Sequence, residues 1–109
     1  LLELHIACSL SPDADVTFDV RGIPLRYHAA RQELTLGAHK TAWPVEDGNL
    51  ALILFVDRTC IELFSQDGLL YAPVAAIPDP KLKTVTWTVG AGQVKALRGS
   101  AHALRSIWP

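Results

Sequence analysis

The sequence has no methionine, two cysteines and no excess of charge of either sign. Ten Lys and Arg residues against eleven Asp and Glu give a net charge of -1, which argues against nucleic-acid binding as the main role. No run of about 18 apolar residues is present, so we expect no membrane-spanning segment. Half of the residues are hydrophobic, which excludes intrinsic disorder, and the length of 109 residues allows one ordinary domain.

The missing initiator methionine predicts that residues 1–109 are one module of a longer polypeptide. The chain opens with Leu1-Leu2-Glu3-Leu4, which is typical of a strand, and shows no basic stretch followed by an apolar stretch and a small-residue cleavage site. We therefore expect the module to have been separated from its neighbours by processing or by the choice of its boundaries.

Residues that carry chemistry are sparse and scattered. The four histidines show no metal-ligand spacing and no Cys-x-x-Cys occurs, so we expect neither a metal nor another cofactor. Ser100 lacks the flanks of a nucleophile elbow, and the glycines after residue 89 lack those of a phosphate-binding loop. Cys8 and Cys60 both fall in predicted strands, where either one disulfide or two buried free thiols would fit.

Apolar and polar residues alternate with a period of two along most of the chain, which is typical of β-strands. The alternation predicts short strands at 2–8, 16–20, 25–29, 34–36, 50–56, 59–64, 69–77, 83–89, 93–98 and 101–107. The residues from 94 onward also fit a helical stripe, which the Gly99-Ser100 pair disfavours. Turn residues between the strands favour an antiparallel sandwich or barrel.

The three tryptophans have different expected roles. Trp87 alternates with two valines, so we expect it in the core, and Trp108 ends the last strand and is expected to close that core. Trp43 lies in a polar loop beside Pro44, which makes it the exposed candidate for stacking on a sugar. A lone tryptophan in a loop more often packs as a lid on the core, so the packing lid is the favoured role for Trp43 and the sugar contact is the alternative.

The clearest hairpin joins Leu50–Val56 to Thr59–Phe64 through a two-residue connection at Asp57-Arg58, which pairs Leu54 with Ile61. The opposite face of the hairpin is also mostly apolar, although a sandwich strand normally keeps one face wet. That face carries Ala51, Ile53, Phe55, Cys60, Glu62 and Phe64. Either loops of the same domain cover it, or part of it rests on a neighbouring domain or subunit.

Three acids surround this hairpin, and their positions predict structural roles. Asp57 opens one turn and Asp67-Gly68 forms another. Glu62 lies in mid-strand on the apolar face, so we expect it to pair with a cation, for which Arg58 is a candidate, or with a neighbouring domain.

The segment 50–68 resembles the signature hairpin of the C-terminal β-sandwich of family 32 glycoside hydrolases, which include invertases, levanases and inulinases. That hairpin has apolar residues, then Val-Asp-Arg-Ser-Ser-Val-Glu-Val-Phe, and a short stretch that ends in Asn-Asp-Gly. The matching residues are Asp57, Arg58, Glu62, Phe64, Asp67 and Gly68, whereas Thr59-Cys60 replaces the two serines and Gln66 replaces the asparagine. The likeness covers nearly the whole chain, although His28 stands where an aspartate is usual.

The resemblance implies an antiparallel two-sheet β-sandwich of the jelly-roll or concanavalin-like type without catalytic residues of its own. In the family the catalytic acids lie on an N-terminal five-bladed propeller, in Asn-Asp-Pro-Asn-Gly, Arg-Asp-Pro and Glu-Cys motifs that this sequence lacks. The implied parent is a secreted or periplasmic retaining hydrolase of fructosyl linkages in sucrose, levan or inulin, whose propeller this module would support. The alternatives are an independent lectin-like module that binds carbohydrate near Trp43, and a homodimerisation module.

Overall fold

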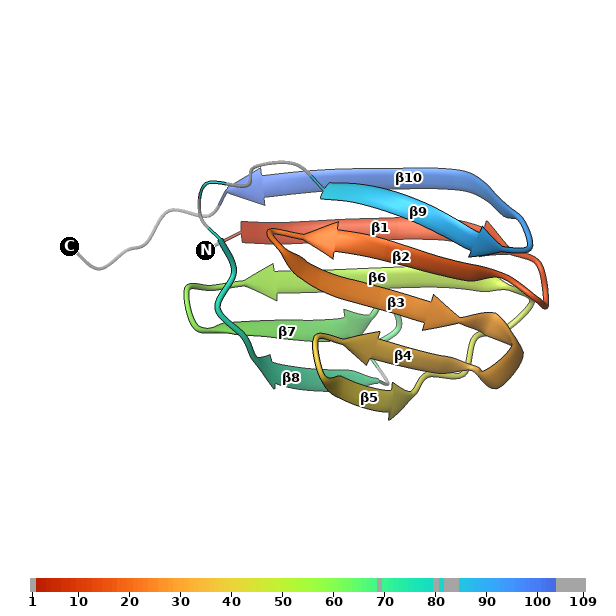
Figure 1. Cartoon of the computed structure of the whole chain (residues 1–109), viewed down its shortest axis with the longest axis horizontal. Coiled ribbons are helices and arrows are strands. Elements are labelled where there is room, and N and C mark those ends of the chain that lie inside the picture. The colour runs from red at the N-terminus through yellow and green to blue at the C-terminus, as the bar shows by residue number, and fades with distance from the viewer. Residues whose placement is uncertain (1, 69, 80, 82–84, 104–109) are drawn as a thin grey trace.

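The computed structural model describes residues 2–68, 70–79, 81 and 85–103, which form two antiparallel sheets packed face to face (Figure 1). Sheet A has the strand order β10-β1-β6-β7-β8, and sheet B has the order β5-β4-β3-β2-β9. The strands are β1 (Leu2–Leu10), β2 (Asp15–Val20), β3 (Ile23–His28), β4 (Glu33–Leu36), β5 (His39–Ala42), β6 (Asn49–Val56), β7 (Cys60–Ser65), β8 (Tyr71–Ala75), β9 (Val85–Ala91) and β10 (Val94–Ala103). A 3-10 turn at Ala29–Arg31 links β3 to β4. The all-β sandwich predicted from the sequence is confirmed.

The core lies between the two sheets and follows from the alternation along the strands. In β1, β2, β6 and β7 every second side chain is buried, and most of the others are half-buried on the outer faces. The largest buried side chains include Phe18, Leu25, Tyr27, Leu34, Leu36, Leu50, Leu52, Leu54, Ile61 and Leu63. Burying one such side chain is worth about 1.5–3 kcal/mol relative to leaving it exposed, so these inner faces hold the sandwich together.

The turn between β2 and β3 consists of Arg21 and Gly22, which both have positive φ (50° and 87°), as the mirror-image hairpin turns require. The Gly22 amide donates a hydrogen bond to the Asp19 carboxylate (2.8 Å), and the Asp79 amide donates to the Arg21 carbonyl oxygen (2.8 Å). These two hydrogen bonds fix the conformation of the turn and hold the backbone of Arg21 in place. The turn lies near the start of β1.

The turn between β6 and β7 lies one residue later than predicted. The Asp57 amide donates to the Cys60 carbonyl oxygen (2.9 Å), which places both of these residues outside the two-residue connection. The sequence predicted that Leu54 pairs with Ile61. In the structure Leu54 pairs with Leu63. Strand partners shift by two positions, and because side chains alternate with a period of two, every side chain keeps its predicted face.

The end of the described chain forms one strand, β10, where the sequence predicted two strands at 93–98 and 101–107. Gly99 and Ser100 remain paired with β1, because both residues keep the backbone N–H and C=O groups that a ladder needs. The predicted residues beyond 103 lie outside the described part of the chain.

Cys8 and Cys60 are free thiols, so the disulfide interpretation is wrong. Cys8 is buried on the inner face of β1, and this burial raises the pKa of its thiol to about 11. Cys60 is half-buried at the start of β7, where the side chains of alternate residues face outward. The two thiols therefore lie on opposite faces of sheet A, a placement that a disulfide could not bridge.

Candidate interaction surfaces

The acidic residues of the hairpin motif lie in the two turns that flank β7. The Asp57 carboxylate accepts a hydrogen bond from the Arg58 amide (2.7 Å) in the exposed turn before the strand. After the strand, the Ser65 hydroxyl donates to the Asp67 carboxylate and accepts from a backbone amide across the turn (2.9 Å). Gly68 in that turn has a φ of 76°, a conformation that glycine adopts without steric cost. Asp57 and Asp67 thus hold the ends of β7.

Phe55, Phe64 and Tyr71 form a line of side chains across the outer face of sheet A, which we call the aromatic row. The Phe64 ring centre lies 5.7 Å from that of Phe55, in an edge-to-face arrangement, and 4.7 Å from that of Tyr71. Ile53 pairs directly with Phe64 and extends the apolar surface onto β6. Tyr71 is 53% exposed, so the row reaches solvent at β8. The second apolar face predicted for the hairpin is therefore present and continues onto a third strand.

Glu62 lies beside the aromatic row, directly opposite Phe55 in the ladder. The Tyr71 hydroxyl donates a hydrogen bond to its carboxylate (3.4 Å). Partial burial and the nearby Glu62 charge together raise the pKa of Tyr71. None of the ion pairs among the described residues joins Glu62 to Arg58, the cation suggested by the sequence. Within the described structure, the aromatic row is thus bordered by a carboxylate that no cation neutralises.

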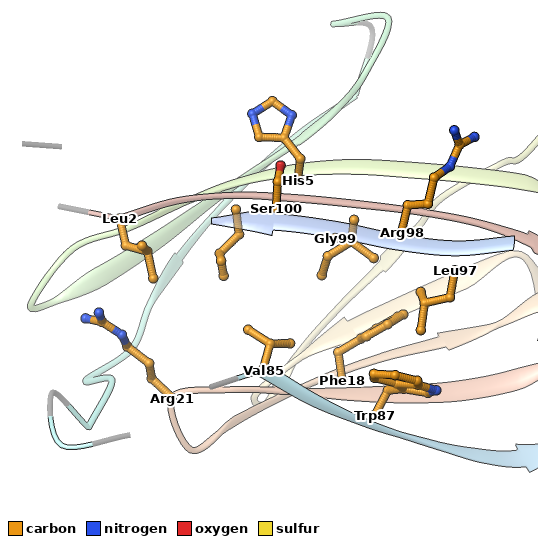
Figure 2. Close-up of a pocket in the computed structure, with 12 residues that line it drawn as sticks. Leu2, His5, Phe18, Arg21, Val85, Trp87, Leu97, Arg98, Gly99 and Ser100 are labelled. Carbon is orange, nitrogen blue, oxygen red and sulfur yellow. The ribbon is translucent and has the colours of Figure 1, made fainter. Parts of the chain in front are cut away.

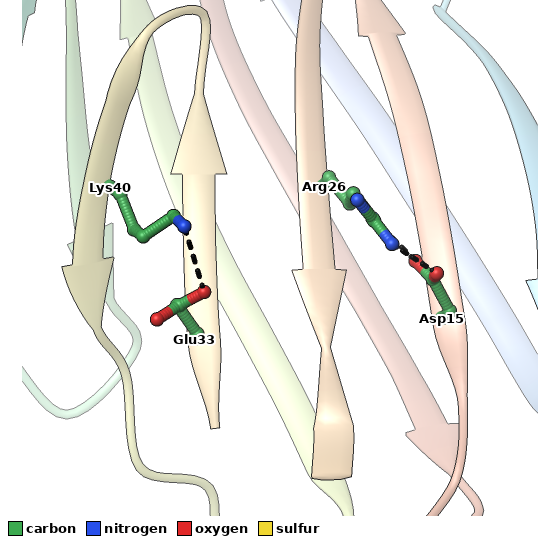
Figure 3. Close-up of polar contacts among 4 residues, drawn as sticks. All are labelled: Asp15, Arg26, Glu33 and Lys40. Carbon is green, nitrogen blue, oxygen red and sulfur yellow. Dashed lines mark hydrogen bonds and ion pairs between the residues drawn. The ribbon is translucent and has the colours of Figure 1, made fainter. Parts of the chain in front are cut away.

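The outer face of sheet B has the opposite character (Figure 3). Arg26 on β3 donates two hydrogen bonds to the Asp15 carboxylate on β2, and this pairing holds the pKa of Asp15 below its usual range. Lys40 on β5 forms an ion pair with Glu33 on β4 (3.5 Å). Charged pairs with exposed cations are typical of a solvated surface. The two outer faces therefore differ, with sheet B polar and sheet A apolar at its centre.

The three acids around the hairpin do not converge. Asp57 and Asp67 lie beyond opposite ends of β7, whose six residues span about 20 Å at the rise of a β-strand. Retaining glycosidases need two carboxyl groups about 5 Å apart. Among the described residues, no group of three or more His, Cys, Asp or Glu side chains could hold a metal ion. That part of the chain also contains no helix with the length and apolar character needed to cross a membrane.

Trp43 is buried, with 3% of its surface exposed, which agrees with the favoured role as a packing lid and contradicts the alternative of an exposed ring that stacks on a sugar. The buried Tyr27 hydroxyl donates to the Trp43 carbonyl oxygen (2.6 Å), and the Trp43 amide donates to the Gln32 carbonyl oxygen (2.8 Å). The loop after β5 is therefore pinned to sheet B, and the Trp43 ring joins the core. Trp43 acts as the packing lid, and its ring is not available to stack on a sugar.

A slot of about 380 Å³ opens between the sheets at the edge formed by β9 and β10. Leu2 and Leu97 from sheet A point toward Phe18, Val85 and Trp87 from sheet B (Figure 2). Trp87 is 55% exposed, which overturns the prediction that this residue belongs to the closed core. The face of Trp87 was predicted correctly, but the described residues leave space between the sheets at this edge.

A glycine on β10 leaves room in this part of the slot. Gly99 stands at the register position opposite the inward-facing Ile6 of β1, and it has no side chain to extend toward sheet B. Arg21 lies at the end of the slot near Leu2, and its Nε atom is buried without a hydrogen-bond partner among the residues that the structure describes. Sequence patterns could not reveal this slot, because alternation predicts which face a residue lies on and not what opposes it.

Comparison with known proteins finds a similarity to a levanase from Bacillus sp. (strain L7). The two sequences are 29% identical over 70 residues, a segment that makes up 64% of this chain and 8% of that levanase. No model of a protein family matches the chain, and no solved structure matches it. The chain is thus similar to a small part of a levanase, and its fold is an antiparallel β-sandwich.

Proposed function

We propose that this chain is a non-catalytic β-sandwich module of a family 32 glycoside hydrolase, and that it packs against and supports a catalytic five-bladed propeller. The observation that carries the proposal is the 70-residue similarity to a levanase. The hairpin motif and the sandwich fold agree with it, and the dispersed acids around the hairpin give no site for glycoside cleavage. The parent enzyme would hydrolyse fructosyl linkages such as those of levan, inulin or sucrose.

In this proposal the outer face of sheet A packs on the propeller. The aromatic row gives that face an apolar centre, whereas sheet B presents ion pairs to solvent. Apolar centres with polar groups around them are common at interfaces between domains and subunits. Glu62 would then meet a cation or a hydrogen-bond donor of the propeller, because a buried carboxylate without a partner is costly.

The lectin-like alternative loses its main support in the structure. Trp43, the residue on which it depended, is buried. Trp87 is exposed, but the walls around it are mainly aliphatic and aromatic, whereas a sugar needs several polar partners for its hydroxyl groups. Homodimerisation through the aromatic row remains a competing explanation, and the experiments below separate it from docking on a propeller.

The first experiment compares the 109-residue chain with the full polypeptide encoded by its gene. Both are assayed for release of reducing sugar from levan, inulin and sucrose. We expect turnover by the full polypeptide and none by the isolated chain. Turnover by the isolated chain would show that it carries its own active site, and a full polypeptide without fructosyl hydrolase activity would remove the proposed parent.

The second experiment tests the docking face. In the full polypeptide, Tyr71→Lys and Phe64→Thr on sheet A are compared with Thr88→Lys, which changes an exposed residue of β9 on sheet B. We expect the two sheet A variants to lower the thermal stability of the propeller and its activity after heating, while Thr88→Lys leaves both unchanged. Equal effects in all three variants would reject this face, and loss of a dimer without any effect on the propeller would favour homodimerisation.

A further inference from the structure

Strand β9 lies at an edge of sheet B and, among the described residues, pairs with β2 on one side only. Its register with β2 is regular from Val85 to Val89 and shifts between Val89 and Ala91. Trp87 (55% exposed) and Val89 (42% exposed) are the large apolar side chains that this strand leaves in solvent. The N–H and C=O groups on the free side of an edge strand are a ready template for another strand. Within the described structure, β9 therefore offers backbone groups and apolar side chains at the same edge.

The strands at the other three sheet edges carry features that discourage such pairing, and β9 does not. β5 has only four residues and includes Lys40, and β8 has Pro73 at its centre. β10 carries the cations Lys95 and Arg98. Short strands, proline and charged side chains are the usual protections of an exposed edge. The regular segment of β9, residues 85–89, contains neither a charge nor a proline, so its sequence does not oppose the addition of a strand.

The sequence of this segment is complementary to itself. In an antiparallel pair of two copies with a two-fold axis at Trp87, the two Trp87 residues would face each other. Thr86 would face Thr88 of the second copy. Val85 would face Val89 of the second copy. Aromatic pairs, threonine pairs and pairs of apolar residues are favourable directly across an antiparallel ladder, and no like charges would meet in this register. The strand that fits this edge best on the grounds of side-chain pairing is thus another β9.

We propose that a second copy of this chain pairs with β9 through its own β9, so that the two five-stranded B sheets join into one continuous sheet. An axis perpendicular to the sheet keeps both Trp87 side chains on the same face, where each covers part of the exposed surface of the other. Two short strand segments make a small interface, which is typical of weak association. The inference is independent of the proposed parent enzyme, and loss of the β9 dimer should leave the stability of its propeller unchanged.

The test is sedimentation velocity of the 109-residue chain at protein concentrations from about 1 to 500 μM, a range chosen for a weak interface. We expect the parent chain to shift from monomer to dimer as the concentration rises. Trp87→Lys and Trp87→Glu should each weaken the dimer by about a hundredfold or more, because each sets two like charges opposite each other and removes the two covered rings. An equimolar mixture of these two variants should associate more tightly than either variant alone, because opposite charges then face each other across the axis.

Two lysine variants of sheet B keep the test decisive if circular dichroism shows that a change at Trp87 unfolds the chain. Thr86→Lys keeps the Trp87 ring and adds a cation to an exposed position of β9, so it should also weaken the dimer. Thr41→Lys adds the same charge to β5, at the far edge of sheet B, and should leave the dimer unchanged.

The outcomes that would overturn the proposal are distinct from one another. A parent chain that stays monomeric at every concentration would overturn it, as would a dimer that survives Thr86→Lys. A mixture of the two Trp87 variants that associates no better than each alone would reject the pairing centred on Trp87. Loss of the dimer in Tyr71→Lys, with Thr86→Lys unaffected, would place the contact on the aromatic row instead of β9.

Discussion

The hydrogen bond from Tyr27 to the Trp43 loop gives the sharpest quantitative prediction. Tyr27 is 1% exposed, and its hydroxyl donates to the Trp43 carbonyl oxygen over 2.6 Å. Tyr27→Phe keeps the ring and removes the donor, so the carbonyl oxygen loses a partner in a site that excludes water. Leaving such a group unsatisfied costs about 1–3 kcal/mol, a sizeable part of the roughly 5–15 kcal/mol that stabilises a domain.

The assay is urea unfolding of the 109-residue chain followed by circular dichroism, with Tyr71→Phe as the matched control. The Tyr71 hydroxyl makes a longer bond, 3.4 Å to Glu62, on an exposed ring, so its loss should change the unfolding free energy much less. Burial raises the pKa of Tyr27 to about 12, so its hydroxyl stays protonated and the effect should not change between pH 6 and 9, since even the upper end of this range is about 3 units below that pKa. Equal losses in the two variants, or a changed dependence on urea, would refute the reasoning.

Three other outcomes follow from single contacts. Gly48→Ala should lower the stability of the chain more than Gly68→Ala, as thermal unfolding would measure. Both glycines have positive φ, which costs a non-glycine residue roughly 1–2 kcal/mol. A Cβ at Gly48 would in addition overlap a carbonyl oxygen of β1, whereas a Cβ at Gly68 would meet no atom of the described structure. In the native chain a maleimide should modify Cys60 and spare the buried Cys8 until urea is added, and mass spectrometry would identify the modified residue. Equal rates of modification of the two thiols in the native chain would contradict the burial of Cys8. Asp15→Asn should lower the unfolding free energy near neutral pH, because it removes the ion pair with Arg26. The difference in unfolding free energy between this variant and the parent chain should shrink as the pH falls below about 4 through the lowered pKa of Asp15, since protonation of Asp15 then removes the same ion pair from the parent chain. A difference that stays constant with pH would argue against this.

The sequence predicted the faces of the strands well, because alternation is a local property of the chain. The hairpin shows how far this extends. Its turn was misplaced by one residue, yet Leu54 and Leu63 still face the core and Phe64 still faces outward. A shift in the turn by one position moves strand partners by two, which preserves the face, so the binary pattern tolerates an error in the exact register.

The prediction for Trp87 failed and the favoured packing role of Trp43 was confirmed, because burial depends on what lies opposite a residue. Trp43 has no periodic pattern around it, and it is buried because Tyr27 and Gln32 hold its backbone against sheet B. Trp87 has a clear pattern, and it is exposed within the described structure, where Gly99 of β10 brings no side chain to the slot. Long-range pairing decided both outcomes, and a single sequence gives no direct signal for it.

The hairpin motif gains a physical meaning from these contacts. Asp57 and Asp67 form hydrogen bonds in the turns at the two ends of β7. These turns fix how β6, β7 and β8 pair, and that register is what brings Phe64 between Phe55 and Tyr71 on the outer face. A motif made of turn residues and alternating apolar residues can therefore specify an apolar outer face, which is the face that we propose packs on a propeller.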